Sequence, residues 1–240
     1  MDCWAACLDE CGGGVSREHY ISDGIFDEKA ITAFGLSWCK EKPLTIGLAS
    51  AVSKILCKKH NEAVSQFDRE AAKLSRFLSA NILDDPLARN EVTLDGALLE
   101  RWSLKTLLNL GYIGALDQEN FVQLQPPPEI VKSLFQNAKV PDGIGLYFVT
   151  GSTITNQSYK NELSWDAIRI VSNSNVLGMT FTFNGIRFVV SIVPVRLEEK
   201  IAKMGVVKGV DYSRAKIVYR PASIVLSSNT AGRKVVNLKW

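Results

Sequence analysis

Two stretches near the start of the chain, CWAACLDECGGGVSREH (3–19) and LCKKHN (56–61), decide the fold of its first third. Together they hold four of the five cysteines and both histidines of the 240 residues. In an intracellular chain, cysteines crowded in this way indicate metal binding before disulfides. The first stretch also ends in an acid–base pair, and the second enters a helix.

The second stretch places a thiol and an imidazole one helical turn apart. Cys57 and His60 are separated by two residues at a helix start, which is typical of the second half of a structural zinc site. Two N-terminal cysteines would complete a set of three thiols and one imidazole. Cys7 and Cys11 are the favoured pair, because the glycine after the second cysteine lets the backbone turn around the metal. Cys3 stays an alternative to either of them.

A zinc ion would matter for folding, because residues 1–60 show little core of their own. Its binding contributes on the order of 10 kcal/mol in small metal-stabilised units. The plain alternative is a set of unliganded thiols. Cys39 has no partner at ligand spacing, and we expect it in the core beside Trp38.

The dipeptide Glu18-His19 joins a carboxylate to an imidazole. A histidine takes a proton from water near neutral pH, and an adjacent carboxylate holds a divalent cation or orients the ring. Alone, such a pair is more often an ordinary feature of a protein surface.

In combination, these features resemble the HNH nucleases, the zinc-stapled branch of the His-Me finger group. The shared order is a cysteine pair, Glu-His at the end of a short strand, and Leu-Cys-x-x-His-Asn entering a helix, over about residues 3–68. In that family a ββα-metal unit places the strand histidine opposite a catalytic cation. The resemblance implies that His19 is the general base and that Glu18 and Asn61 hold Mg²⁺ or Mn²⁺.

The same resemblance assigns a separate structural Zn²⁺ to Cys7, Cys11, Cys57 and His60. It thus predicts a metal-dependent endonuclease that hydrolyses phosphodiester bonds in DNA. The family's middle asparagine is expected four or five residues before Cys57, where this chain has Val52 and Ser53 instead.

Positive side chains lie within the two stretches. Lys58 and Lys59 precede Asn61 at the helix start, where the helix dipole favours phosphate, and Arg17 stands beside the Glu-His pair. We therefore expect these three residues to contact DNA. The net charge of +3 adds only a weak lean toward nucleic acid.

Two helices are expected after the second stretch. Apolar residues at steps of three and four predict one from Lys58 to about Asn81, with 84–86 marking its break and the charges Asp68 and Glu70 on its solvated face. A second is predicted over 94–110, capped by Thr93. A brief helix at 28–34 and one strand at 45–56 are predicted upstream.

Three consecutive prolines at 126–128 predict the start of a third helix, running through Leu134. Beyond it, β-branched and aromatic residues predict strands at 145–150, 167–171, 178–183, 186–193, 216–219, 223–226 and 235–238. Asn184-Gly185 predicts a two-residue hairpin turn that pairs Met179, Phe181 and Phe183 with Val190, Phe188 and Ile186.

The expected fold class is therefore α+β. We predict a zinc-bound ββα-metal module at 1–82, a helical connector at 83–125 and an antiparallel β-rich domain at 126–240. A hydrophobic content of 46% supports folded domains, and no apolar run of eighteen residues indicates a membrane span. Acidic residues stand where a signal peptide would carry positive charge, so we expect a cytoplasmic protein.

A function of a different class fits the same residues. The zinc-stapled finger can serve without catalysis, as a scaffold or as a nucleic-acid or protein interaction module whose β-rich domain makes the specific contacts. A small-ligand site between the sheet and the 94–110 helix is a third hypothesis.

Overall fold

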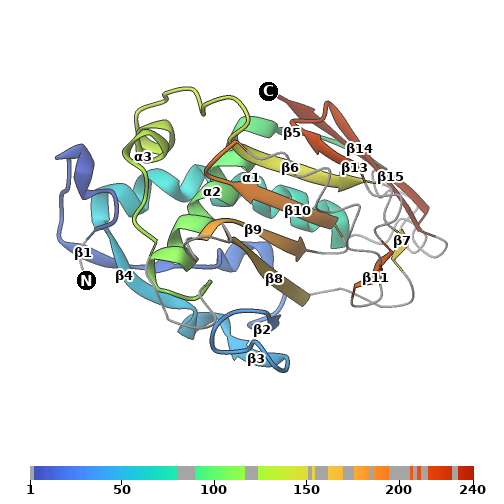
Figure 1. Ribbon diagram of the computed structural model, residues 1–240, viewed down its shortest axis with the longest axis horizontal. Coiled ribbons are helices and arrows are strands. Elements are labelled where there is room, and N and C mark those ends of the chain that lie inside the picture. Colours follow the sequence, from blue (N-terminus) through green and yellow to red (C-terminus); the bar gives the residue numbers. More distant parts are fainter. Residues whose placement is uncertain are drawn as a thin grey trace.

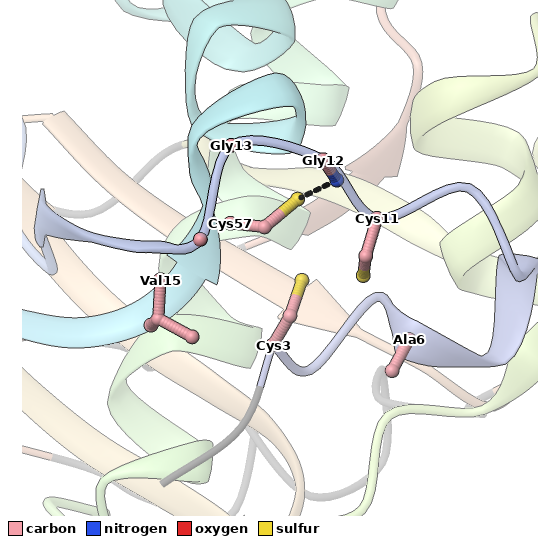
Figure 2. A pocket seen from close by; sticks show the side chains of 8 residues that line it. Cys3, Ala6, Cys11, Gly12, Gly13, Val15 and Cys57 are labelled. Atoms are coloured by element: carbon pink, nitrogen blue, oxygen red, sulfur yellow. Dashed lines mark hydrogen bonds between the residues drawn. The ribbon is translucent and has the colours of Figure 1, made fainter.

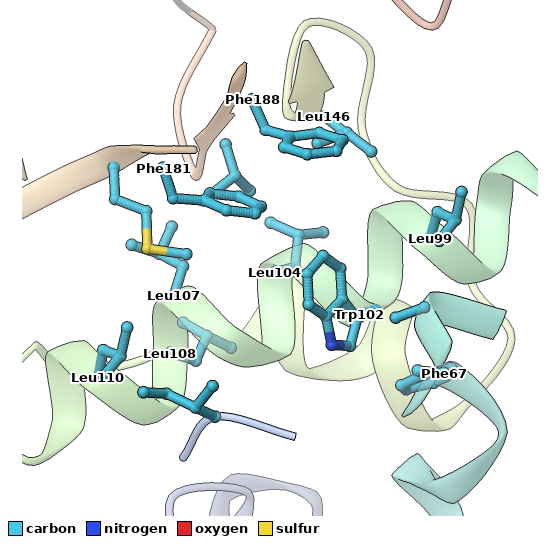
Figure 3. Close-up of a cluster of buried hydrophobic side chains, with 14 of the residues drawn as sticks. Phe67, Leu99, Trp102, Leu104, Leu107, Leu108, Leu110, Leu146, Phe181 and Phe188 are labelled. Atoms are coloured by element: carbon cyan, nitrogen blue, oxygen red, sulfur yellow. The ribbon is translucent and has the colours of Figure 1, made fainter. Parts of the chain in front are cut away.

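Helices α1 (Lys58–Ser79) and α2 (Gly96–Tyr112) pack against each other at the centre of the fold. On α1, apolar side chains recur three and four residues apart and form one buried stripe, as its sequence period predicts. Helix α2 is buried on almost every side, because it lies between α1 and the strands β6 (Gly145–Thr150), β10 (Ile186–Ser191) and β9 (Val176–Phe183) (Figure 1). Trp102 of α2 meets Phe181 edge to face at 5.7 Å (Figure 3).

The computed structural model describes residues 3–79, 90–116, 124–150, 153–154, 162–169, 176–183, 186–194, 206–207, 210–211, 216–228 and 232–240. Over these residues the chain is a mixed α+β protein with mostly antiparallel sheets, in agreement with the predicted class. The predicted helix break at 84–86 and the Asn184-Gly185 turn lie outside the described residues.

Strands β1 (Val15–His19) and β4 (Val52–Cys57) form a two-stranded antiparallel ribbon, and β4 runs directly into α1. A β-bulge between Ser16 and Arg17 shifts the register of β1 by one residue. The ribbon and the start of α1 therefore bring the two decisive sequence stretches side by side.

The segment between the two ribbon strands differs from its prediction. The helix expected at 28–34 is wrong, because Ala30–Phe34 is strand β2, on which Ile31 and Ala33 alternate with less buried neighbours. The single strand expected at 45–56 is divided by a 3-10 turn, η3 (Leu48–Ser50), into β3 (Leu44–Gly47) and β4. A second turn, η2 (Asp23–Ile25), packs on α1.

The largest sheet has seven strands, drawn from both ends of the chain. In spatial order they are β13 (Lys216–Tyr219), β6 (Gly145–Thr150), β10 (Ile186–Ser191), β9 (Val176–Phe183), β8 (Glu162–Arg169), β2 and β3 (Leu44–Gly47). All neighbours are antiparallel except β2 and β8. The sheet therefore runs across both predicted domain boundaries.

The register predicted for the β9–β10 pair is confirmed. Phe181 lies opposite Phe188 and Met179 opposite Val190. The two phenylalanine rings stack with centroids 4.8 Å apart and lie over α2 (Figure 3). Alternation of buried residues along both strands fixes this register, since a slip by one residue would turn the aromatic rings out of the core.

A second sheet has the order β14 (Ser223–Ser228), β15 (Gly232–Lys239) and β5 (Glu91–Asp95). Strand β5 pairs parallel to β15, and α2 follows it at once. The predicted cap Thr93 is thus a strand residue. The carboxylate of Asp95 instead accepts the backbone N–H of Leu98 at 2.9 Å and caps α2.

The remaining elements are short. Helix α3 (Pro128–Phe135) starts within the proline run as predicted, and η1 (Ala6–Leu8) packs on it. Strands β11 (Val206–Val207), β12 (Val210–Asp211) and β7 (Thr153–Ile154) form a further small sheet in that order. Among the described helices, none combines the length and the apolar character needed to span a bilayer.

Candidate functional site

Three thiols and one imidazole meet where the ribbon joins α1. Cys57 ends β4, His60 lies in the first turn of α1, and Cys3 and Cys11 flank η1. Their ligand atoms all lie within 4.8 Å of one another. The three sulfurs point into one pocket, which also opens to solvent (Figure 2). We call these four residues the thiol–imidazole cluster.

The glycine run after Cys11 gives the cluster its shape. The backbone N–H of Gly12 donates to the sulfur of Cys57 at 3.5 Å (Figure 2), and the carbonyls of Gly12 and Gly14 accept the N–H groups of Lys59 and Lys58 at 3.2 and 2.9 Å. These bonds satisfy two donors that a helix start leaves open. Gly13 has a φ of +77°, and a Cβ there would stand 2.8 Å from that of Lys58, so only glycine fits.

The spacing of the donors fits a tetrahedral metal ion. The Nδ1 atom of His60 lies 3.2 Å from the sulfur of Cys57, 3.4 Å from that of Cys3 and 3.9 Å from that of Cys11. Zinc–sulfur and zinc–nitrogen bonds of about 2.3 and 2.0 Å imply edges of about 3.5 Å in a tetrahedron. Three thiolates and one imidazole are a common zinc set, so the cluster can hold Zn²⁺.

The protonation states agree with this use. Burial lowers the pKa of His60, which keeps its ring neutral and leaves a nitrogen lone pair for a metal. Burial would raise the pKa of Cys57, but the N–H groups of Gly12 and His60 near its sulfur lower it. Burial raises the pKa of Cys11 to about 12, so this thiol would give up its proton only to a bound cation.

The thiol–imidazole cluster contains Cys3 and not Cys7, which the sequence favoured. Cys7 lies within η1 with an exposed thiol, and it is not one of the four residues that converge. Cys3 is buried beside Trp4, whose backbone N–H donates to the carbonyl of Ile55 at 3.0 Å and ties this segment to β4. The spacing of the cysteines gave no signal for this choice, whereas the tryptophan next to Cys3 did.

A second cluster lies around a fully buried lysine. The Nζ atom of Lys105 on α2 stands 2.6 Å from a carboxylate oxygen of Glu18 and 2.8 Å from one of Asp68. The side chain of Lys105 is 0% exposed, that of Glu18 5% and that of Asp68 28%. The hydroxyl of Ser22 donates to Asp68 and lies 3.4 Å from the ammonium. We call Glu18, Ser22, Asp68 and Lys105 the lysine cluster.

The lysine cluster corrects the expected position of two carboxylates. Glu18 lies in the interior, where the Lys105 ammonium neutralises it, and Asp68 binds the same ammonium. Glu70, also expected in solvent, is buried and accepts the backbone N–H of Asp95 at 2.8 Å. Burial alone would lower the pKa of Lys105, but the two carboxylates raise it, so the side chain stays charged.

Sequence reasoning missed Lys105, although a signal was present. It lies three residues after Trp102 and four before Asn109, on a face of α2 whose other members are buried. A lone charge on such a face requires a buried partner of opposite charge. Trp102 also donates from its indole Nε1 to Ser22 at 3.0 Å.

Asn61 is hydrogen-bonded to β1, the strand that carries His19. The side-chain amide of Asn61 donates through Nδ2 to the hydroxyl of Ser16 at 3.0 Å and to the carbonyl of Arg17 at 2.9 Å. Both acceptors belong to β1, the strand that ends at the half-buried His19. No described residue donates to the Oδ1 atom of Asn61, so this oxygen is held in place with its lone pairs free.

The three expected phosphate contacts are all exposed. Lys58 forms an ion pair of 4.0 Å with Glu62, and Lys59 one of 2.9 Å with Glu10.

Comparison of the chain with protein-family models, with curated proteins and with solved structures finds no match. Its function must therefore be inferred from the geometry of these clusters.

Proposed function

We propose that the chain is a zinc-stabilised, metal-dependent phosphodiester hydrolase of the HNH type acting on DNA. The order of elements supports this: an antiparallel ribbon leads directly into a helix, and the thiol–imidazole cluster lies at their junction. In this proposal Cys3, Cys11, Cys57 and His60 hold the structural zinc. The zinc takes no part in the reaction and fixes the N-terminal segment to the start of α1.

The orientation of Asn61 is the observation that carries the proposal. Two hydrogen bonds from its Nδ2 atom to β1 leave Oδ1 as a positioned, uncharged oxygen ligand beside the strand of His19. Magnesium accepts oxygen ligands and keeps several waters, so one protein ligand together with substrate phosphate oxygens is compatible with its chemistry. A cation bound there would stabilise charge on the scissile phosphate.

The remaining roles belong to side chains of the ribbon. His19 would accept a proton from the attacking water, because histidine is the side chain that most often acts as a general base. Glu18 does not fit the role of cation ligand, because its carboxylate is buried and already paired with Lys105. Its part in the proposed site is to fix β1 against α2, which in turn positions His19 as the next residue.

A plasmid-nicking assay with Mg²⁺ or Mn²⁺ tests the proposal. Wild type should convert supercoiled to open-circular plasmid, and both His19→Ala and Asn61→Ala should lose this activity while keeping their zinc content. The melting temperature of Asn61→Ala should fall slightly, because two hydrogen bonds to β1 are lost. Gln66→Ala is the matched control, because Gln66 is exposed on α1 and bonds only to the carbonyl of Ala63 among the described residues. Cutting that survives in both variants would overturn the assignment of base and ligand.

A non-catalytic module is the second candidate, and the lysine cluster favours it. A fixed ammonium occupies the space between the carboxylates that a divalent cation would otherwise share. A finger of this kind could bind nucleic acid or protein without cutting. Duplex binding by wild type with no nicking in either metal would establish this candidate in place of the hydrolase.

A further inference from the structure

The β1–β4 ribbon places two positive side chains directly opposite each other. In the register of the pair, Arg17 lies across from Lys54, and both are exposed. Residues directly opposite in an antiparallel pair project from the same face with Cβ atoms about 5 Å apart. Like charges in this relation destabilise the pairing. The ribbon therefore carries a local electrostatic cost.

Nothing in the described part of the chain offsets that cost. Neither Arg17 nor Lys54 forms an ion pair with a described residue. The neighbouring Lys58 and Lys59, in contrast, each have a glutamate partner, at 4.0 and 2.9 Å. Of the positive groups around the ribbon, Arg17 and Lys54 are thus the two whose charge is left for an external anion.

The shape of the ribbon indicates which anion. A two-stranded ribbon fits the major groove of B-form DNA, and its long basic side chains can then reach the phosphates at the groove edge. Val15, 41% exposed, and the half-buried His19 lie two residues either side of Arg17 on β1, so the exposed face extends along the strand.

We infer that Arg17 and Lys54 form the phosphate contact of this chain and bind the backbone of double-stranded DNA. The inference deepens the proposed function by naming its substrate contact, and it rests on DNA being the partner but not on the cleavage step. It adds Lys54 to the residues expected from the sequence and removes Lys58 and Lys59, because each of these has a glutamate carboxylate within 4.0 Å that lowers the local positive potential.

Fluorescence anisotropy with a short labelled duplex, in zinc and without added Mg²⁺, tests the inference. Each lost phosphate contact should reduce the salt dependence, the slope of log K against log salt, by about 0.9, which corresponds to about an eightfold loss of affinity at 0.1 M salt. The double variant Arg17→Ala with Lys54→Ala should therefore bind about sixtyfold more weakly, with a slope about 1.8 smaller.

The matched control is Lys58→Ala with Lys59→Ala, which removes the same total charge from the adjacent helix turn. It should change the affinity less than fivefold. An equal loss in both double variants would overturn the inference, because only net charge would then matter. So would preserved duplex binding in the ribbon variant, or binding to anionic-lipid vesicles but not to duplex.

Lys54→Glu adds an independent readout. An opposite charge facing Arg17 should stabilise the ribbon and raise the melting temperature, while duplex affinity falls by more than the eightfold loss of one contact. A purely structural role would move both quantities together. Nicking is not scored in these experiments, so a wild type that binds as expected but does not cut disproves the hydrolase alone.

Discussion

The thiol–imidazole cluster and the lysine cluster lie on the same ribbon and helix, but they differ in whether the protein itself supplies a cation to their ligand atoms. The first gathers three sulfurs and the Nδ1 atom of His60, and none of its four members is a positively charged side chain. The second gathers two hard carboxylates and supplies their cation from α2, as Lys105. The contrast indicates that one cluster is built for an added ion and that the other is complete.

The difference follows from ligand chemistry. Thiolates bind a zinc ion far better than they bind an ammonium group, so a lysine side chain could not take the place of a metal ion among the sulfurs. Carboxylates pair well with an ammonium group at hydrogen-bond distance, and two of them suffice to keep a buried lysine charged. The fold therefore neutralises the carboxylates of the lysine cluster itself, and of the two clusters only the thiol–imidazole cluster can take up a metal ion.

Removing the metal should have the largest effect. Cys57→Ser should abolish stoichiometric zinc binding and expose residues 3–14 to protease, because the metal contributes on the order of 10 kcal/mol in comparable sites. Ile21, Ile31 and Ile55 are buried in the core, so the rest of residues 1–60 should stay protected. Zinc content by atomic emission and limited proteolysis measure the result.

Cys7→Ser is the matched control for that variant, since the Cys7 thiol is exposed and outside the cluster. It should keep its zinc and its protease resistance, and Cys3→Ser should lose both. Zinc loss in the Cys7 variant together with retention in the Cys3 variant would reverse the ligand assignment.

The lysine cluster should respond to loss of its cation. Lys105→Met leaves the Glu18 carboxylate buried and unpaired, and should lower the free energy of unfolding by about 3–5 kcal/mol. Urea denaturation measures this. Adding Glu18→Gln and Asp68→Asn to the same protein should recover part of the loss, and no recovery would mean that packing, not charge, caused it.

Asn109 links the two regions and should give an intermediate effect. Its Oδ1 atom accepts the indole N–H of Trp4 at 2.9 Å, and its Nδ2 atom lies 3.5 Å from the carboxylate of Glu18. Asn109→Leu should cost about 1–3 kcal/mol, because it leaves the indole N–H of Trp4 without its acceptor. Because Trp4 adjoins Cys3, zinc affinity should fall as well. Unchanged zinc affinity would show that the two clusters are independent.

The smallest effect should come from an exposed ion pair beside the thiol–imidazole cluster. Lys59→Ala removes the contact of Lys59 with Glu10, and both side chains are about half exposed, at 55% and 48%. Solvent screens such pairs, so the melting temperature should stay within error of wild type. A clear drop would mean that Glu10 helps to hold the neighbouring Cys11.

A periodic apolar pattern predicted α1, the proline run predicted α3, and the Asn184-Gly185 pair predicted the β9–β10 register, because each of these signals lies close in sequence to what it specifies. The strand β2 was mistaken for a helix, since its identity depends on pairing with β8, more than a hundred residues away. The same dependence on long-range contacts limited the prediction of the two clusters. Cys57 and His60 share a helical turn and could be found, whereas Glu18 and Lys105 meet only in the folded chain.

The pairing of β2 with β8 has a practical consequence for anyone who wishes to study the first third alone. The chain leaves the ribbon after β1, completes the seven-stranded sheet with β2 and β3, and only then returns to form β4. Truncation would leave the edge of β2 unpaired in the fragment and the edge of β8 unpaired in the remainder, and unpaired strand edges promote aggregation. Recombinant pieces ending near residue 82 should therefore precipitate, and isotope labelling for spectroscopy is better done on the intact polypeptide.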